Sequence, residues 1–201
     1  NGSTDYLEQF DSGDINAGGA TGDLAIEHVP DGDAHKTTNS QENGFQFGID
    51  VDTNSAPFVV HTEVEKPFFY VNGNPSTPQN YQSLGLQIGN GTQDGYLKVV
   101  VAANGGNGGI QVALEKSAGN FTEAMYADSF VGGDILDASE ISLYILIDPA
   151  AMTAQPQVSI DGGNTVVSLG APLSIPASWL SSTDDQGLAV GMISTSTGNN
   201  A

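Results

Sequence analysis

The chain has 201 residues, and 24 Asp and Glu residues against 4 Lys and no Arg give it a formal net charge of −20 at pH 7. Nucleic acids and anionic membrane surfaces are bound by clustered basic side chains, so this balance argues against both kinds of partner. There is no Cys, which excludes disulfides and thiolate chemistry, and no apolar run approaches the ~20 residues that span a membrane.

Short apolar runs with period-two alternation, separated by Gly, Asn and Asp, follow one another along the chain. The alternation predicts strands at Asp5–Phe10, Asp23–Val29, Phe45–Val51, Pro57–Lys66, Leu84–Ile88, Tyr96–Ala102, Ile110–Lys116, Ile141–Ile147, Gln157–Ile160, Thr165–Leu169 and Gly187–Ile193.

Helix signals are scarce. The stretch Ser139–Asp148 alternates strictly and is predicted as a strand. Pro176–Leu180 is the best short helical turn, and we expect Trp179 within it to be anchored in the core. Two polar stretches, Pro30–Asn43 and Asn72–Asn80, are predicted to be long loops and not linkers, because each is flanked by strands that need partners.

About a dozen short strands joined by regular turns favour an all-β fold, a two-sheet antiparallel β-sandwich that forms a single domain over residues 1–201. A domain of this length can bury a core without disulfides. The high negative charge is typical of a protein suited to saline, calcium-containing surroundings, and an ordinary acidic surface without ion dependence is the alternative.

Four segments carry a resemblance to a known family. They read YQSLGLQIGN at 81–90, DGYLKVVV at 94–101, GIQVALE at 109–115 and GLAVGMISTS at 187–196. The chain resembles the concanavalin A-like lectin/glucanase superfamily, and more narrowly the jelly-roll modules of large secreted bacterial multidomain proteins. The opening DYLEQFD at 5–11 also looks like that family's first strand. The resemblance implies a jelly roll and an extracellular or cell-surface location in a bacterium.

In such modules the chain continues past a segment like 193–200 into a final strand with an aromatic and an acidic residue. Here the sequence stops at Ala201, so we expect a sandwich that lacks its final strand and has an open sheet edge. An open edge exposes unpaired backbone groups, which a second chain can pair with. Trimming of the sequence, or replacement by another strand, is the alternative explanation.

Two carboxylates on one predicted strand are the first candidates for chemistry. In His61-Thr-Glu-Val-Glu65 the odd-numbered side chains share one face, and alternate residues lie about 7 Å apart along a strand. Glucanases of this fold present an acid and a nucleophile in a similar way. Their Glu-x-Asp-x-x-Glu pattern is absent, so a solvated polar face is the main expectation and a Glu63 and Glu65 pair the alternative.

Polar and aromatic residues on several strands are predicted to look outward together as one face. Sugar sites combine aromatic rings with amide and carboxylate groups. The candidate ligand-binding residues are His61, Glu63, Gln87, Tyr96, Lys98 and Tyr144, with Gln46 and Gln111 on the same face. A merely solvated face is the alternative.

Acidic loops offer oxygen ligands for a hard cation, so calcium is the expected cofactor. The candidate ligands in such loops are Asp31, Asp33, Asp184 and Asp185, and Asp50 with Asp52 forms a further cluster. The family resemblance adds Glu8 and Asp11 in the first predicted strand, because members of that family bind calcium near their termini. None completes an EF-hand loop. A zinc site built from His28, His35 and His61 is the weaker alternative.

These observations favour a non-catalytic extracellular module for carbohydrate binding or adhesion, stabilised by calcium, with a polysaccharide or glycan as its partner. The first alternative is a structural subunit of a filament or surface assembly, in which strand donation through the open edge drives self-association. The second is a glycoside hydrolase of the same fold, because the fold hosts both lectins and enzymes.

Overall fold

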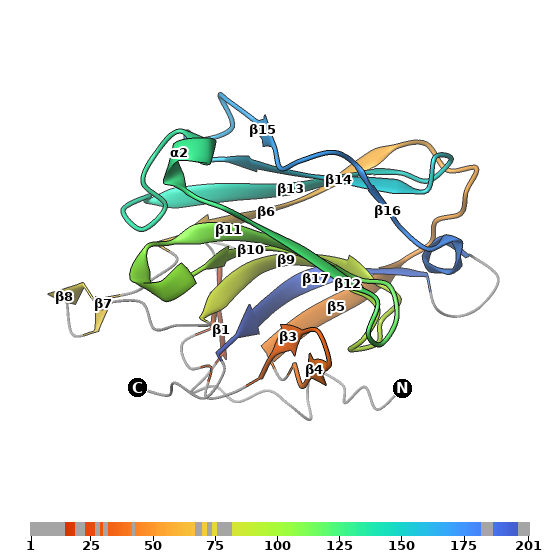
Figure 1. Cartoon of the computed structure of the whole chain (residues 1–201), viewed down its shortest axis with the longest axis horizontal. Helices are drawn as coiled ribbons and strands as arrows, with labels where there is room; N and C mark the ends of the chain where they lie inside the picture. The colour runs from red at the N-terminus through yellow and green to blue at the C-terminus, as the bar shows by residue number, and fades with distance from the viewer. Residues whose placement is uncertain are drawn as a thin grey trace.

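The computed structural model describes residues 15–18, 23–26, 29, 32–41, 43–66, 70–71, 74–75, 82–181 and 187–196. Within them, two antiparallel sheets form the sandwich (Figure 1). The six-stranded sheet has the order β12 (Phe121–Tyr126), β11 (Gly109–Glu115), β10 (Tyr96–Ala102), β9 (Ser83–Gly89), β17 (Leu188–Thr195) and β5 (Asn43–Ile49). The five-stranded sheet has the order β15 (Val167–Ser168), β14 (Thr153–Ser159), β13 (Glu140–Asp148) and β6 (Phe58–Glu65), with β16 (Leu173–Ser174) also paired to β14. The predicted all-β sandwich is therefore confirmed.

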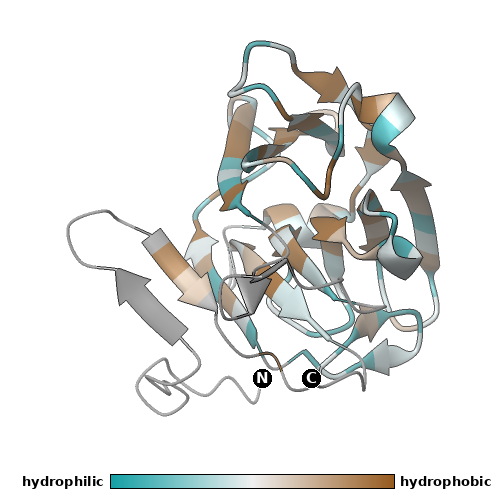
Figure 2. Ribbon diagram, turned by 90° about the vertical axis from the view of Figure 1, so that its left-hand side faces the viewer, coloured by the Kyte–Doolittle hydropathy of each residue, from teal (hydrophilic) through white to brown (hydrophobic). Residues whose placement is uncertain are grey.

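The core lies between the two sheets and is built from one side of each strand. Because side chains alternate across a strand, every second residue points inwards. Leu97, Val99 and Val101 of β10 are fully buried, and so are Leu143 and Ile145 of β13. Figure 2 shows hydrophobic segments on the strands of both layers. Burial of branched apolar side chains at roughly 25 cal/mol per Å² is what holds the layers together.

The other side of each sheet is an outer face, and the two outer faces differ. On the six-stranded sheet the outer face is partly covered by a small hairpin, β3 (Ala34–His35) with β4 (Thr38–Asn39). Ala34 packs in one buried cluster with Tyr96, Val100 and Ile193 of that face. The amide of Ser196 also donates to the carbonyl of Gly32, at 3.1 Å. Figure 1 shows the hairpin below the lower layer. The hairpin is therefore an added layer over one sheet.

The helical turns are short and lie outside the sheets. They are η1 (Asn104–Gly106), α2 (Asp128–Val131) and η2 (Ala177–Leu180). Trp179 of η2 is 1% exposed and belongs to the main core, as the sequence predicts. None of the helices in the described part of the chain is long and apolar enough to cross a membrane.

Most predicted strands are found with shifts of one to three residues at their ends. The stretch Ser139–Asp148 is a strand and not a helix. Strand β12 was not predicted, because its sequence FTEAMY has no β-branched apolar residue and carries a Glu. The strand predicted at Gln157–Ile160 begins earlier in the structure, at Thr153. The prediction began too late because a proline such as Pro156 usually breaks a strand.

Strand β14 tolerates this proline because of how its neighbours are arranged. Strand β16 pairs with Thr153 and Ala154, and β15 pairs with Gln157 and Val158. Pro156 lies in the interval between these two short partners, where a missing N–H breaks no ladder bond.

Two predicted loops contain short strand pairs. The hairpin β3–β4 lies within Pro30–Asn43, and β8 (Asn74–Pro75) lies within Asn72–Asn80 and pairs with β7 (Tyr70–Val71). A further pair joins β1 (Ile15–Gly18) to β2 (Asp23–Ile26). Two-residue strands are too short to show a period in the sequence. The strand predicted at Asp5–Phe10 lies outside the described residues.

Candidate functional site

A cavity of about 650 Å³ opens on the outer face of the six-stranded sheet, beside the β3–β4 hairpin. One wall comes from the hairpin, the floor from β10 and β11, and the far wall from β12 and the segment before η1. The lining residues with polar side chains are Asp33, His35, Gln82, Ser83, Lys98, Asn104, Gln111, Glu123 and Thr195. Hairpin and sheet thus form the site together.

Lys98 is the unusual residue of the floor. Its position on β10 places it between Tyr96 and Val100 on the outer face, and the side chain is 2% exposed. Among the described residues it makes no hydrogen bond or salt bridge, although it lines the cavity. Burial lowers the pKa of Lys98 to about 8, while the charges of Asp33 and Glu123 act in the opposite direction. A buried ammonium without a close partner is costly, and such residues concentrate at functional sites.

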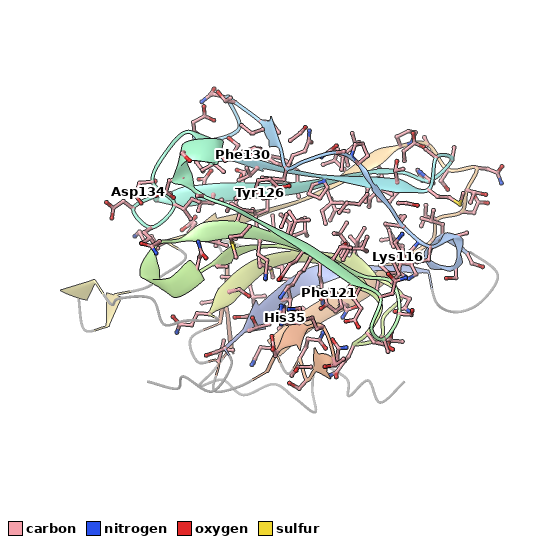
Figure 3. The ribbon with its side chains drawn as sticks, in the orientation of Figure 1. His35, Lys116, Phe121, Tyr126, Phe130 and Asp134 are labelled. Atoms are coloured by element: carbon pink, nitrogen blue, oxygen red, sulfur yellow. The ribbon has the colours of Figure 1, made fainter. Side chains whose placement is uncertain are left out.

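Glu123 of β12 ties the far wall to the hairpin. Its Oε2 lies 3.1 Å from Nε2 of His35 and accepts a hydrogen bond from Nε2 of Gln111 at 3.2 Å. The His35 ring also meets Phe121 edge-on, with centroids 5.1 Å apart. Figure 3 labels both rings, which come from the hairpin and from β12. Two polar contacts and one ring contact therefore fix the Glu123 carboxylate toward the cavity.

Asp33 supplies the second carboxylate at the hairpin side. Its Oδ1 accepts a hydrogen bond from the amide of Ala34 at 2.8 Å, and the Asp33 amide donates to Oγ of Ser40 at 3.2 Å. These two hydrogen bonds fix the conformation of the chain at the start of the hairpin. The cavity therefore presents one ammonium, two carboxylates, one imidazole and several amides and hydroxyls. Such a mixture of strong donors and acceptors suits a ligand that has many neutral hydroxyl groups.

The predicted single ligand face is split between the two outer faces. His61, Glu63 and Tyr144 lie on the outer face of the five-stranded sheet, on β6 and β13, whereas Lys98 lies on the opposite side of the sandwich. Period-two alternation predicts which residues of one strand share a face, but not which sheet the strand joins. The expectation that these residues look outward together is therefore wrong.

On the five-stranded sheet, the rings of His61 and Tyr144 stack as cross-strand neighbours, with centroids 4.4 Å apart and planes at 12°. Nε2 of His61 lies 4.0 Å from Oε1 of Glu63. Glu63 and Glu65 are exposed on the edge strand β6. The cavity beside the β3–β4 hairpin is not lined by any of these four residues.

The remaining predicted ligand residues lie on the six-stranded sheet but are covered. Gln87 is 4% exposed, and Tyr96 is 2% exposed beneath the hairpin cluster. Burial, and after it the charge of Glu115, raises the pKa of Tyr96. The sequence pattern places both residues on the correct face, but it does not show that a second layer covers them.

The predicted calcium site stays a prediction. Glu8, Asp11, Asp31, Asp184 and Asp185 lie outside the described residues, and Asp33 lines the cavity. No group of three or more His, Asp or Glu residues suited to a metal occurs in the described ranges.

The other clusters have structural explanations. Asp52 accepts a hydrogen bond from the amide of Asn54 at 2.8 Å, which holds its pKa below the usual value in a tight turn. The zinc alternative fails for geometric reasons, since His35 and His61 lie on opposite outer faces, and His28 lies outside the described residues.

Sequence reasoning missed Glu123 as a site residue and considered His35 only as a zinc ligand. Both depend on elements that were not predicted, β12 and the β3–β4 hairpin. One signal was available, because the alternation Phe121, Glu123, Met125 places a carboxylate between two large side chains on one face.

Comparison with known proteins finds similarity in structure but not in sequence. No family model matches the chain, and no curated protein matches it. A GH43 glycoside hydrolase engineered to display both endo-xylanase and exo-arabinofuranosidase activity is 17% identical, with a TM-score of 0.63 over 95% of this chain and 34% of that one. A GH43_12 protein from a capybara gut metagenome is 14% identical, with a TM-score of 0.59 over 90% of this chain and 30% of that one.

A third match differs in length and lacks an assigned activity. A functionally unknown protein from Saccharomyces cerevisiae is 15% identical, with a TM-score of 0.56 over 93% of this chain and 81% of that one. At these identities the matches establish a shared fold. The chain spans about a third of the length of the two hydrolases, whereas it spans most of the yeast protein.

The comparisons correct one expectation from the sequence. A chain without enzymatic activity was expected, but two of the solved structures that share this fold over part of their length are glycoside hydrolases, so that expectation is not upheld. At these identities the matches establish the shared fold and do not single out the lectin/glucanase superfamily.

Proposed function

We propose that the chain is the carbohydrate-active β-sandwich of a secreted glycoside hydrolase and that it holds a segment of a neutral polysaccharide in the outer-face cavity. The observation that carries the proposal is the cavity itself. It combines the buried ammonium of Lys98 with the carboxylates of Asp33 and Glu123. Ring hydroxyls both donate and accept hydrogen bonds, so a sugar satisfies both kinds of group at once.

The charges favour a neutral ligand. Two carboxylates and one ammonium line the cavity, and the chain as a whole carries a formal charge of −20. A polyanion would be repelled over the whole surface, an effect that salt screens within a Debye length of about 8 Å. One solved hydrolase that shares the fold is named for xylanase and arabinofuranosidase activity, and a further GH43 structure, with a TM-score of 0.52, is named for xyloglucan. Neutral plant-type glycans are therefore the first ligands to test.

A second candidate is that the cavity itself cleaves the glycan. Its motivation is the presence of two carboxylates, Asp33 and Glu123, in one cavity beside a buried lysine. Glycoside hydrolysis needs a pair of carboxyl groups on either side of the bond. Glu63 and Glu65 are less suited, because both are exposed on an edge strand and neither lines the cavity.

The binding proposal is tested by calorimetry and affinity electrophoresis with xylan, arabinan and xyloglucan, and with polygalacturonate as the anionic comparison. We expect a neutral glycan to bind, and Lys98→Met and Glu123→Gln each to weaken binding at least tenfold. His61→Ala on the opposite outer face is the matched control and should bind like the wild type. Failure of every neutral glycan to bind, or cavity variants that both bind as tightly as the wild type, would overturn the proposal.

The two candidates separate in a hydrolysis assay on the same glycans. If the cavity cleaves, Asp33→Asn and Glu123→Gln abolish product formation by this chain while measurable glycan binding remains in at least one of them. If the cavity only holds the glycan, this chain releases no product. Loss of product in a Glu63→Gln variant alone would contradict both candidates, because it would place the chemistry on the other sheet.

A further inference from the structure

Lys98 combines properties that are seldom found together in a lysine. Its side chain is 2% exposed, it lines the cavity on the outer face of the six-stranded sheet, and among the described residues it forms no hydrogen bond or salt bridge. Lysines are almost never fully buried unless they are paired. The position of this amine therefore calls for an explanation other than packing, and the cavity beside it is the place to look for one.

The register of the sheet sets an acid–base pair beside this amine. Lys98 of β10 is the direct partner of Ala113 on β11, and Ala113 is the direct partner of Glu123 on β12. Neighbouring strands lie about 4.8 Å apart, so Lys98 and Glu123 stand in one row of the outer face with only a methyl group between them. Nε2 of His35 lies 3.1 Å from Oε2 of Glu123. An imidazole and a carboxylate in contact can hold a proton and pass it on.

The β3–β4 hairpin encloses the same space from the other side. Ala34 packs in one buried cluster with Tyr96 and Val100, which are the residues two before and two after Lys98 on the same face of β10. The hairpin therefore crosses the sheet over Lys98, and the residues before and after Ala34 both line the cavity. The amine is in this way shielded from bulk water and open to a ligand in the cavity.

A buried amine in this setting is a nucleophile. Burial lowers the pKa of Lys98 to about 8, against the charges of Asp33 and Glu123. About a tenth of the molecules therefore carry the neutral amine at pH 7, and about half carry it at pH 8. The lone pair of a neutral amine adds to a carbonyl carbon, and lysines that form imines are activated in this way. The cavity of about 650 Å³ lies in the range of small-molecule sites, about 300–1,000 Å³, so a carbonyl compound has room beside the amine.

We propose that Nζ of Lys98 reversibly captures a carbonyl compound as an imine, and that this compound is the open-chain aldehyde of a reducing sugar. The choice of a sugar rests on the proposed function, because a glycan chain ends in such an aldehyde and the amides of Asn104 and Gln111 suit a polyhydroxylated ligand. The reaction of the amine with a carbonyl group does not depend on that choice.

The reaction balances without an oxidant or a reductant. The Nζ lone pair forms a bond to the carbonyl carbon, and the carbonyl π electrons move to oxygen, which takes a proton released by nitrogen. The pair of His35 and Glu123 gives this oxygen a second proton, water leaves, and a protonated imine remains. The protonated imine keeps the single positive charge of the lysine, which the carboxylates of Asp33 and Glu123 stabilise. Hydrolysis reverses each step.

Reductive trapping on the full chain tests the proposal. The protein is incubated at pH 8 with xylose, and separately with glycolaldehyde, in the presence of sodium cyanoborohydride, which reduces an imine to a stable secondary amine. Peptide mass mapping then assigns the adduct among the lysines, which are Lys36, Lys66, Lys98 and Lys116. Exposure alone would label Lys36 and Lys66 first and Lys98 last. We expect about tenfold more adduct on Lys98 than on either exposed lysine, and labelling in the order of exposure would overturn the proposal.

Lys98→Arg keeps a positive charge but has no amine nucleophile, so it should lose the adduct at this position while the other lysines keep theirs. Lys66→Arg, an exposed position just after β6, is the matched control and should keep the Lys98 adduct. The wild-type map decides the question even if a variant fails to fold. Xylan binding without an adduct on Lys98 would overturn this inference and leave the proposed function standing. A glycolaldehyde adduct on Lys98 without binding of any neutral glycan would refute the proposed function and keep the reactive amine.

Discussion

Replacing Lys98 by Met should make the protein more stable while removing glycan binding. The side chain is 2% exposed, and its pKa falls from 10.5 to about 8 because burial disfavours the charged form. A shift of one pKa unit corresponds to 1.36 kcal/mol, so keeping this lysine charged at pH 7 costs the folded state about 3 kcal/mol. Met has a similar length and no charge, and it removes that cost.

The stability difference between the wild type and Lys98→Met should depend on pH. Below pH 8 the lysine is charged in both the folded and the unfolded state, so the cost is fully present. Between pH 8 and 10.5 the folded state releases its proton before the unfolded state does, and the wild type therefore gains stability relative to the variant. The difference in unfolding free energy should be about 3 kcal/mol at pH 7 and should close towards pH 10.5.

Urea unfolding at pH 7, 8, 9 and 10 measures this difference, with calorimetry on xylan run on the same samples. Lys66→Met is the control, because Lys66 is exposed just after β6 and its loss should change stability by less than about 0.5 kcal/mol at every pH. If Lys98→Met were less stable than the wild type at pH 7, the side chain would have a partner that offsets its burial, and our account of the cavity would be refuted.

Three further predictions concern other parts of the molecule. Trp179→Ala should cost about 3–5 kcal/mol in urea unfolding, because a side chain 1% exposed leaves a cavity in the main core; a cost below 1 kcal/mol would show that η2 is not anchored there. His35→Ala should lower stability by at most about 1 kcal/mol, since its pair with Glu123 is partly exposed, but it should weaken glycan binding in calorimetry; unchanged affinity would remove His35 from the site. Gly191→Ala should lower the yield of soluble protein and the Tm, because a Cβ there would meet the backbone carbonyl of Phe45 on β5; a wild-type Tm would show that the two strands can separate freely.

The fold could be predicted from the sequence because its signal is local. Alternation in stretches such as Tyr96–Ala102 and Ile141–Ile147 requires only that each strand has an inner and an outer side, and the structure has both. The short helical turn around Trp179 was also predictable, from Pro176 followed three residues later by an aromatic residue in a Ser-rich region.

The site could be predicted only in part, because it depends on relations between elements that are distant in sequence. Lys98 and Asp33 were both singled out, but for different roles, and nothing local indicates that a hairpin carries Asp33 to the face that bears Lys98. Assignment of a strand to one sheet or the other separates His61 from Lys98, and it is decided by packing of the whole chain. The covered state of Tyr96 likewise depends on the hairpin, whose two-residue strands have no readable period.

The β3–β4 hairpin can change independently of the sandwich beneath it. It adds two-residue strands and belongs to neither sheet, yet it supplies Asp33 and His35 to the cavity. Surface connections of this kind accept insertions, deletions and substitutions more readily than the strands of a core. Ligand choice in proteins of this architecture can therefore diverge by exchange of one short segment while the sheets, and the stability they provide, stay the same. Grafting hairpins of other lengths onto this chain is a direct route to altered glycan preference.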